Sequence, residues 1–131
     1  MKIAAAFLAD AANVRENTLS VLSGFINQLY RTEFPAVFGA TLVIVTDVLV
    51  EAGGPSIKVS FSFSLRSSQT GQVLWGEDGE LEIEAEAGRR GYIPILIPLT
   101  DLEIPEPGSY EITVRLGDDQ RRIEFYADLA D

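Results

Sequence analysis

The chain has 131 residues and a formal net charge of −10, from 10 basic and 20 acidic residues. This length predicts a single domain over residues 1–131, and an apolar fraction of 47% is typical of a globular protein. Because a field of this sign repels phosphate groups, we expect no nucleic-acid partner and no membrane partner.

The sequence contains no cysteine and no histidine. This excludes disulfide bonds, thiolate zinc sites, cysteine nucleophiles and triads that need a histidine base. It also removes the histidine ligands of the usual zinc, copper and iron sites. We therefore expect no cofactor and no enzymatic activity. An enzyme would have to work with carboxylates alone, and no spacing among the acids selects a pair.

The opening segment, residues 2–11, resembles a short signal peptide. Its apolar run is at the lower limit for such a peptide, and Asp10 lies beside the supposed cleavage site. No run approaches the about 20 apolar residues of a membrane span. We therefore expect a cytoplasmic protein.

Residues 2–30 are compatible with helices or with strands. Alanine-rich residues favour a helix at the start, and after Asn17 or Thr18 as N-cap a set of apolar residues recurs at helical spacing. That set is Leu19, Leu22, Phe25, Ile26 and Leu29.

The alternative for this region is a pair of strands. They would cover residues 2–9 and 19–30, with a polar loop over 13–18 between them. The second strand would bend at Ser23 and Gly24, because glycine is unfavourable in a helix and natural at a bulge. Periodicity alone leaves both interpretations open.

A connector over residues 31–38, where Pro35 blocks regular structure, leads into a long β-branched strand over residues 38–51. Apolar residues occupy both faces of this strand at Leu42, Val43, Ile44 and Val45. Such a strand is either central and covered on both sides, or lends its outer face to another subunit. We take these four residues as the candidate interface.

The middle of the chain predicts further strands. After a turn at Gly53-Gly54-Pro55, residues 57–66 alternate strictly between apolar and polar side chains, which predicts a half-buried strand. A turn over residues 67–71 leads to a strand over 72–75. Gly76 to Gly79 interrupt it, a strand resumes over 80–86, and residues 87–91 form a loop.

The last third predicts an edge strand and a hairpin. Residues 92–99 contain Pro94 and Pro98, which cannot donate to a ladder, so this strand should lie at a sheet edge. Residues 108–126 form a hairpin around a turn at 117–119. Its inward side chains are Tyr110, Ile112, Val114, Leu116, Ile123 and Phe125. Together the segments predict a two-sheet, immunoglobulin-like β-sandwich of about seven to eight antiparallel strands.

Acidic residues offer weak candidates for a metal site. The glutamates of residues 80–86 lie along one strand face and cannot converge on calcium as loop ligands do, so we interpret them as a solvated face. Asp101, Asp118 and Asp119 lie in end loops. They give an alternative function, a calcium- or small-ligand-binding domain, although turn geometry alone explains acids at 118 and 119.

Residues 1–12, residues 19–24, Pro35 and residues 105–110 resemble a family of small bacterial proteins of unknown function. The resemblance runs along most of the chain and implies a β-sandwich in which the first two segments are strands. It implies no catalytic residues. Our leading hypothesis is a non-catalytic module that acts by association with itself, as a homo-oligomer, or with another protein.

Overall fold

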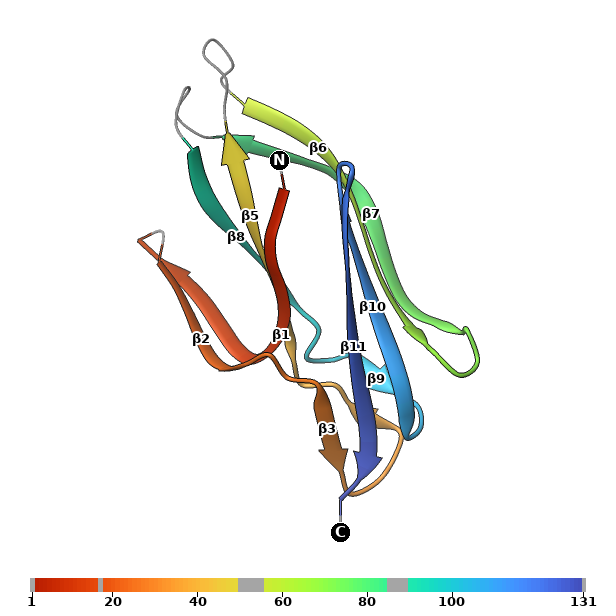
Figure 1. Cartoon of the computed structure of the whole chain (residues 1–131). Coiled ribbons are helices and arrows are strands. Elements are labelled where there is room, and N and C mark those ends of the chain that lie inside the picture. Colours follow the sequence, from red (N-terminus) through yellow and green to blue (C-terminus); the bar gives the residue numbers. More distant parts are fainter. Residues whose placement is uncertain (1, 17, 50–55, 85–89, 131) are drawn as a thin grey trace.

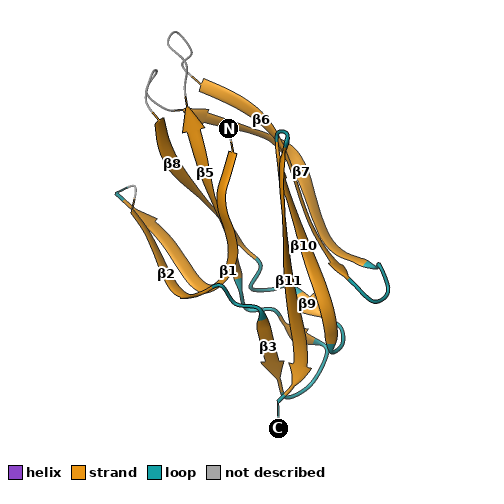
Figure 2. Ribbon diagram, in the orientation of Figure 1, coloured by secondary structure: helices purple, strands orange, loops and turns teal. Residues whose placement is uncertain are grey.

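The computed structural model describes residues 2–16, 18–49, 56–84 and 90–130, and the regular structure of these residues consists of strands alone (Figure 1 and Figure 2). The all-β prediction is confirmed, and the helical interpretation of residues 2–30 is wrong. In chain order the strands are β1 (Lys2–Arg15), β2 (Thr18–Gly24), β3 (Gln28–Arg31), β4 (Ala36–Val37), β5 (Thr41–Leu49), β6 (Ser56–Ser67), β7 (Val73–Glu84), β8 (Arg90–Pro98), β9 (Glu103–Ile104), β10 (Gly108–Leu116) and β11 (Asp119–Leu129).

Two sheets carry the fold. One has the order β2-β1-β5-β8 and the other β3-β11-β10-β6-β7, while β4 pairs with β9. The pairs are antiparallel except for β3, which runs parallel to β11. The described residues form more strands than predicted, because the expected strand over residues 19–30 is divided between β2 and β3 in different sheets, and the short strands β4 and β9 were not predicted. The immunoglobulin-like arrangement stays a prediction.

One apolar core lies between the two sheets. Leu8, Leu42 and Ile44 enter it from the first sheet and are fully buried. From the second sheet, Val59, Phe61, Phe63 and Leu65 of β6 and the inward residues of β10 enter it, as predicted. Phe125 stacks between Phe38 and Tyr110, with ring centroids 4.8 and 5.3 Å apart.

The closing hairpin has the predicted form. β10 and β11 pair from Gly108 opposite Ala127 to Leu116 opposite Asp119, and Gly117 supplies the positive φ of 60° that the turn requires. The hydroxyl of Tyr110 donates a hydrogen bond to the carbonyl oxygen of Glu106, 2.5 Å away.

β7 differs from the prediction. The interruption expected at residues 76–79 is absent, because β7 pairs with β6 along the whole stretch, with Gly79 opposite Phe61. The ring of Phe61 lies over Gly79, where an added Cβ would be 3.1 Å from it. Glycine usually weakens the interior of a strand, but here the ring of Phe61 packs over Gly79, and the strand continues through it.

The remaining predictions concern the position of β8 and two connecting segments. β8 is an edge strand, as its two prolines predicted. The predicted turn at residues 53–55 and most of the predicted loop at 87–91 lie outside the described residues, while residues 90 and 91 belong to β8.

Candidate functional site

β1 changes its partner half-way along its length. Residues 2–9 pair with β5, and residues 9–15 pair with β2, so Ala9 lies opposite both Thr41 and Gly24. The polar loop predicted over residues 13–18 is therefore wrong for residues 13–15, which are part of β1, and for Thr18, which begins β2. We call residues 10–16 and 18–24 the arm; Figure 1 shows this hairpin extending away from the rest of the first sheet.

One face of the arm covers the outer face of its own sheet. Because Ala12 pairs with Val21 and Val14 with Leu19, these four apolar side chains share that face. Ala12 and Leu19 pack against a second buried cluster, which is formed by Phe7, Ala9 and Val43. The arm thus closes a small second core on the side of the sheet away from the main core.

This second core explains why β5 is apolar on both faces. Leu42 and Ile44 point into the main core, Val43 lies in the second cluster, and all three are fully buried. Val45 is half-buried against the second cluster. The first of the two alternatives for this strand therefore holds at Leu42, Val43 and Ile44, which the chain itself covers, so burial does not support an interface at these three residues. An interface at Val45 stays a prediction.

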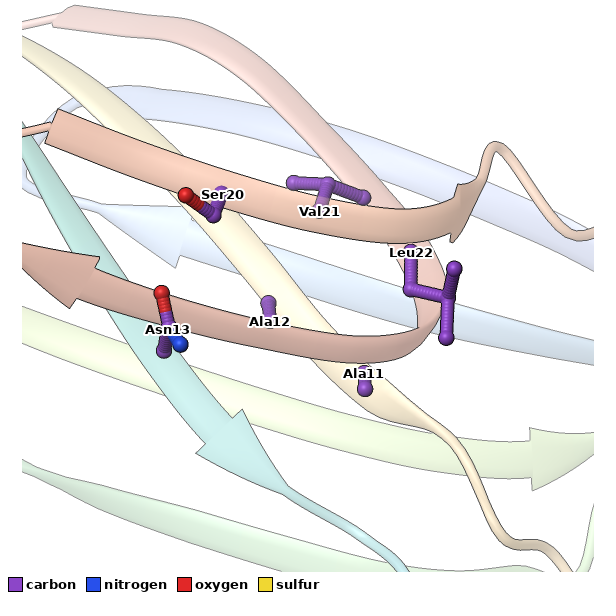
Figure 3. A pocket seen from close by; sticks show the side chains of 6 residues that line it. All are labelled: Ala11, Ala12, Asn13, Ser20, Val21 and Leu22. Atoms are coloured by element: carbon purple, nitrogen blue, oxygen red, sulfur yellow. The ribbon is translucent and has the colours of Figure 1, made fainter.

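The arm and the residue after it carry exposed apolar side chains. Four of the ten large apolar side chains that are exposed in the described chain lie here: Val14, Val21, Leu22 and Phe25. The most exposed are Leu22, at 63%, and Phe25, at 75%. Figure 3 shows Val21 and Leu22 among the residues that line a shallow hollow of about 230 Å³ across both strands of the arm.

A tight corner ends the arm. Ser23 and Phe25 have positive φ angles of 53° and 61°, a conformation that costs a non-glycine residue about 1–2 kcal/mol. Gly24 between them is packed closely, since an added Cβ would lie 3.0 Å from Cγ1 of Val21. The ring of Phe25 stacks on Phe7 at 4.6 Å. The bend predicted at Ser23 and Gly24 is confirmed, and the chain passes there from one sheet to the other.

The edges of the sheets are not protected equally. β8 carries Pro94 and Pro98, and β3 is only four residues long. β7 carries a row of acidic side chains, Glu77, Asp78, Glu80 and Glu82. Prolines, short length and charge all discourage the addition of another strand. β2 has none of these features: its seven residues, TLSVLSG, include neither a charged residue nor a proline.

The first half of β1 is closed by hydrogen bonds on the side away from β5. The N–H of Ile3 donates to Oδ2 of Asp119 at 2.8 Å, and Nη2 of Arg121 donates to the carbonyl oxygen of Ile3 at 2.9 Å. Further along, the N–H of Ile26 donates to the carbonyl oxygen of Leu8 at 3.0 Å. β2 is therefore the strand of the described sheets whose edge is most open to a partner.

The three predicted metal candidates do not meet. Asp119 holds β1, and Asp118 is exposed in the adjoining turn. Asp101 lies between β8 and β9, before β10 begins, whereas Asp118 and Asp119 follow the end of β10. The length of β10, at about 3.4 Å per residue, therefore separates Asp101 from the other two. Among the described residues, no three acids come together in a way that could hold a metal ion.

Asp119 serves the structure of the closing turn. The hydrogen bond from the Ile3 amide, and then those from Arg121 and Gln120, hold the pKa of its carboxyl below the ordinary value, against the effect of burial. The Arg121 guanidinium lies 2.8 Å from Oδ1. The acid expected to fit a turn thus also ties that turn to the first strand.

The arm was not predicted from the sequence. The available signals were the absence of charge and proline in residues 18–24 and the two apolar faces of β5, which require a cover on each side. The glutamates of residues 80–86 that were interpreted as a solvated face are exposed where their side chains are described, at Glu80 and Glu82.

Comparison with known proteins places the chain in a family. No helix among the described residues is long and apolar enough to cross a membrane. No curated protein matches the chain significantly. A family model described as a family of unknown function (DUF6941) matches residues 4–127. That match covers almost the whole chain and confirms the resemblance to a family of unknown function: the chain belongs to DUF6941.

Proposed function

We propose that this protein is a non-catalytic β-module that acts by association with another protein chain, through strand addition at the free edge of β2. In strand addition, a partner strand pairs its backbone with an exposed edge, and neighbouring side chains add specificity. The observation that carries the proposal is the contrast among the edges: β2 is seven residues long, uncharged and free of proline, whereas the other described edges are shielded.

The exposed apolar side chains support the same surface. Val21 and Leu22 lie on β2 itself, and Phe25 follows directly. Apolar side chains beside an open edge create an aggregation hazard, which natural proteins usually remove unless the edge is used. Their retention here favours a contact function.

The charge distribution allows approach at this place. The whole chain carries −10, but β2 carries no charge, and the rest of the arm contributes only Asp10, Arg15 and Glu16. Because long-range repulsion is screened beyond about 8–10 Å at physiological salt, contact at the arm avoids most of the repulsion between acidic surfaces.

A non-catalytic role rests on composition and on the use of the acids. Histidine and cysteine are absent from the sequence. Asp119, an acid with a lowered pKa, is held by the backbone of Ile3 and by Arg121. These structural partners explain the lowered pKa of the acid without a catalytic role.

The test is the mass in solution at tens of micromolar protein, by size exclusion coupled to light scattering. We expect the wild type to associate, and Leu22→Lys to weaken association at least about ten-fold, since a lysine on an edge opposes pairing. Val73→Lys is the matched control, because Val73 is exposed to 62% but lies on β7. A wild type that stays strictly monomeric would exclude a second copy as the partner, and equal effects of the two lysines on an association that does occur would refute strand addition at β2.

A further inference from the structure

We infer that the partner is a second copy of this chain, and that the two β2 strands pair antiparallel about a two-fold axis at Val21. This inference rests on the proposed function and adds its partner and register. Each copy has four strands in this sheet, so the pairing would join them into one continuous sheet of twice that number.

The sequence of β2 suits pairing with itself. A two-fold interface brings the same patch of each subunit together, so any charge on the strand would meet a like charge nearby. β2 carries no charged side chain, so two copies of a chain with a net charge of −10 can pair there without placing like charges opposite each other on the strand. Figure 1 shows β2 at the outer margin of the molecule, with no strand beyond it.

Symmetry restricts the register. A two-fold axis perpendicular to a sheet leaves each face on its own side, so residues that face each other must belong to the same face of the strand. The axis therefore passes at a residue and not between two residues. Val21 is the middle residue of Thr18–Gly24, and an axis there pairs every residue of the strand.

An axis at either neighbour of Val21 is less favourable. With the axis at Leu22, Thr18 and Leu19 would have no partner strand opposite them, and the corner at Gly24 would limit the pairing. With the axis at Val21, Ser20 of one copy faces Leu22 of the other, and Val21 faces its own counterpart. β-branched side chains that face each other in this way stabilise a pair of strands.

The interface would be weak. A single seven-residue strand pair, without a second contact, buries less than the about 1,200 Å² of a stable complex. We therefore expect a dimer that forms at tens of micromolar and dissociates on dilution. Such an equilibrium is best detected with a covalent crosslink that traps the dimer.

The absence of cysteine makes the register directly testable, because an introduced cysteine is the only thiol in the chain. In the proposed register the two Val21 Cβ atoms lie about 4.5–5.5 Å apart. Disulfides join Cβ atoms at about 3.5–4.5 Å, so Val21→Cys is near this range, and a short bismaleimide bridges the remainder.

The experiment oxidises Val21→Cys at tens of micromolar and compares the covalent dimer with that of Val14→Cys. Val14 is the matched control, because it lies on the same face and is exposed to 42%, against 39% for Val21, but belongs to β1, one strand further from the axis. We expect Val21→Cys to become mostly dimeric, with at least about a ten-fold smaller yield from Val14→Cys. If Val21→Cys melts at a lower temperature than the wild type, a mixture of Ser20→Cys and Leu22→Cys provides the same test, because these residues face each other in this register.

The outcomes separate the two proposals. If the wild type dimerises, Leu22→Lys disrupts the dimer and Val21→Cys does not crosslink, then the register is overturned while strand addition at β2 stands. Equal yields from Val21→Cys and Val14→Cys also overturn it. A strictly monomeric wild type overturns this inference, because a second copy is then excluded as the partner of β2, while strand addition by a different chain stands.

Discussion

The carboxylate of Asp119 accepts a hydrogen bond from the backbone N–H of Ile3 at 2.8 Å, across 116 positions of sequence. The same carboxylate contacts Arg121, whose other Nη atom donates to the carbonyl oxygen of Ile3. This three-residue latch fixes the start of β1 against the closing turn.

Replacing Asp119 by alanine should lower the free energy of unfolding by about 1 kcal/mol, since the hydrogen bonds are lost at a partly exposed site. Urea unfolding at neutral pH measures this difference. Asp118→Ala, at the neighbouring exposed position, is the control and should change little.

The contribution of Asp119 should depend on pH. Its folded-state pKa is lower than the ordinary value of 3.8, so the stabilisation is fully present above that value and is lost as the pH falls through the lowered pKa. The difference between wild type and Asp119→Asn in urea midpoint should therefore be constant above about pH 5 and shrink in acid. A difference that instead grows on acidification would contradict the latch.

Val43→Ala should destabilise the folded chain by about 2–3 kcal/mol, because the Val43 side chain of β5 is fully buried against the arm. Val73→Ala, at a site that is 62% exposed, should change the stability by less than about 0.5 kcal/mol. Thermal melting compares the two. A Val43→Ala protein with unchanged melting but altered association would restore residues 42–45 as an interface.

Gly24→Ala should lower the free energy of unfolding by about 1–3 kcal/mol, because the new methyl group would lie 3.0 Å from Val21 and 3.5 Å from Phe7. Gly91→Ala is the control, since an added Cβ there meets no atom within 4 Å. Denaturant unfolding of both variants tests whether the corner is packed as described; equal stability would refute it.

Tyr110→Phe should lower the free energy of unfolding by about 1 kcal/mol through the loss of the hydrogen bond to Glu106. Burial raises the pKa of the Tyr110 hydroxyl above 10.0, so its contribution is present below that pH and is lost as the pH rises. The wild type should therefore lose more stability in alkali than the variant. Tyr126→Phe, at an exposed tyrosine, should behave as the wild type does.

How far the sequence predicts this fold depends on the range of the interactions. The β6 strand and the closing hairpin were predicted because their alternation and turn residues act within a few positions. β7 was wrongly divided at Gly79, because the compensating ring of Phe61 belongs to another strand. The arm was not predicted for the same reason. β1 changes partner at Ala9 without any local break in the sequence, and the only sign of the change is that β5 has a second apolar face that another segment must cover.

The latch between β1 and the closing turn also bears on the order of assembly. β1 is synthesised before every other described strand, yet Ile3 meets its partners only after Asp119 and Arg121 have been made. Domains dominated by such distant contacts fold slowly, and exposed strand edges in their intermediates promote aggregation. We therefore expect the start of β1 to spend most of translation without these two partners, so that chaperone capture or low expression temperature should improve the soluble yield of this protein.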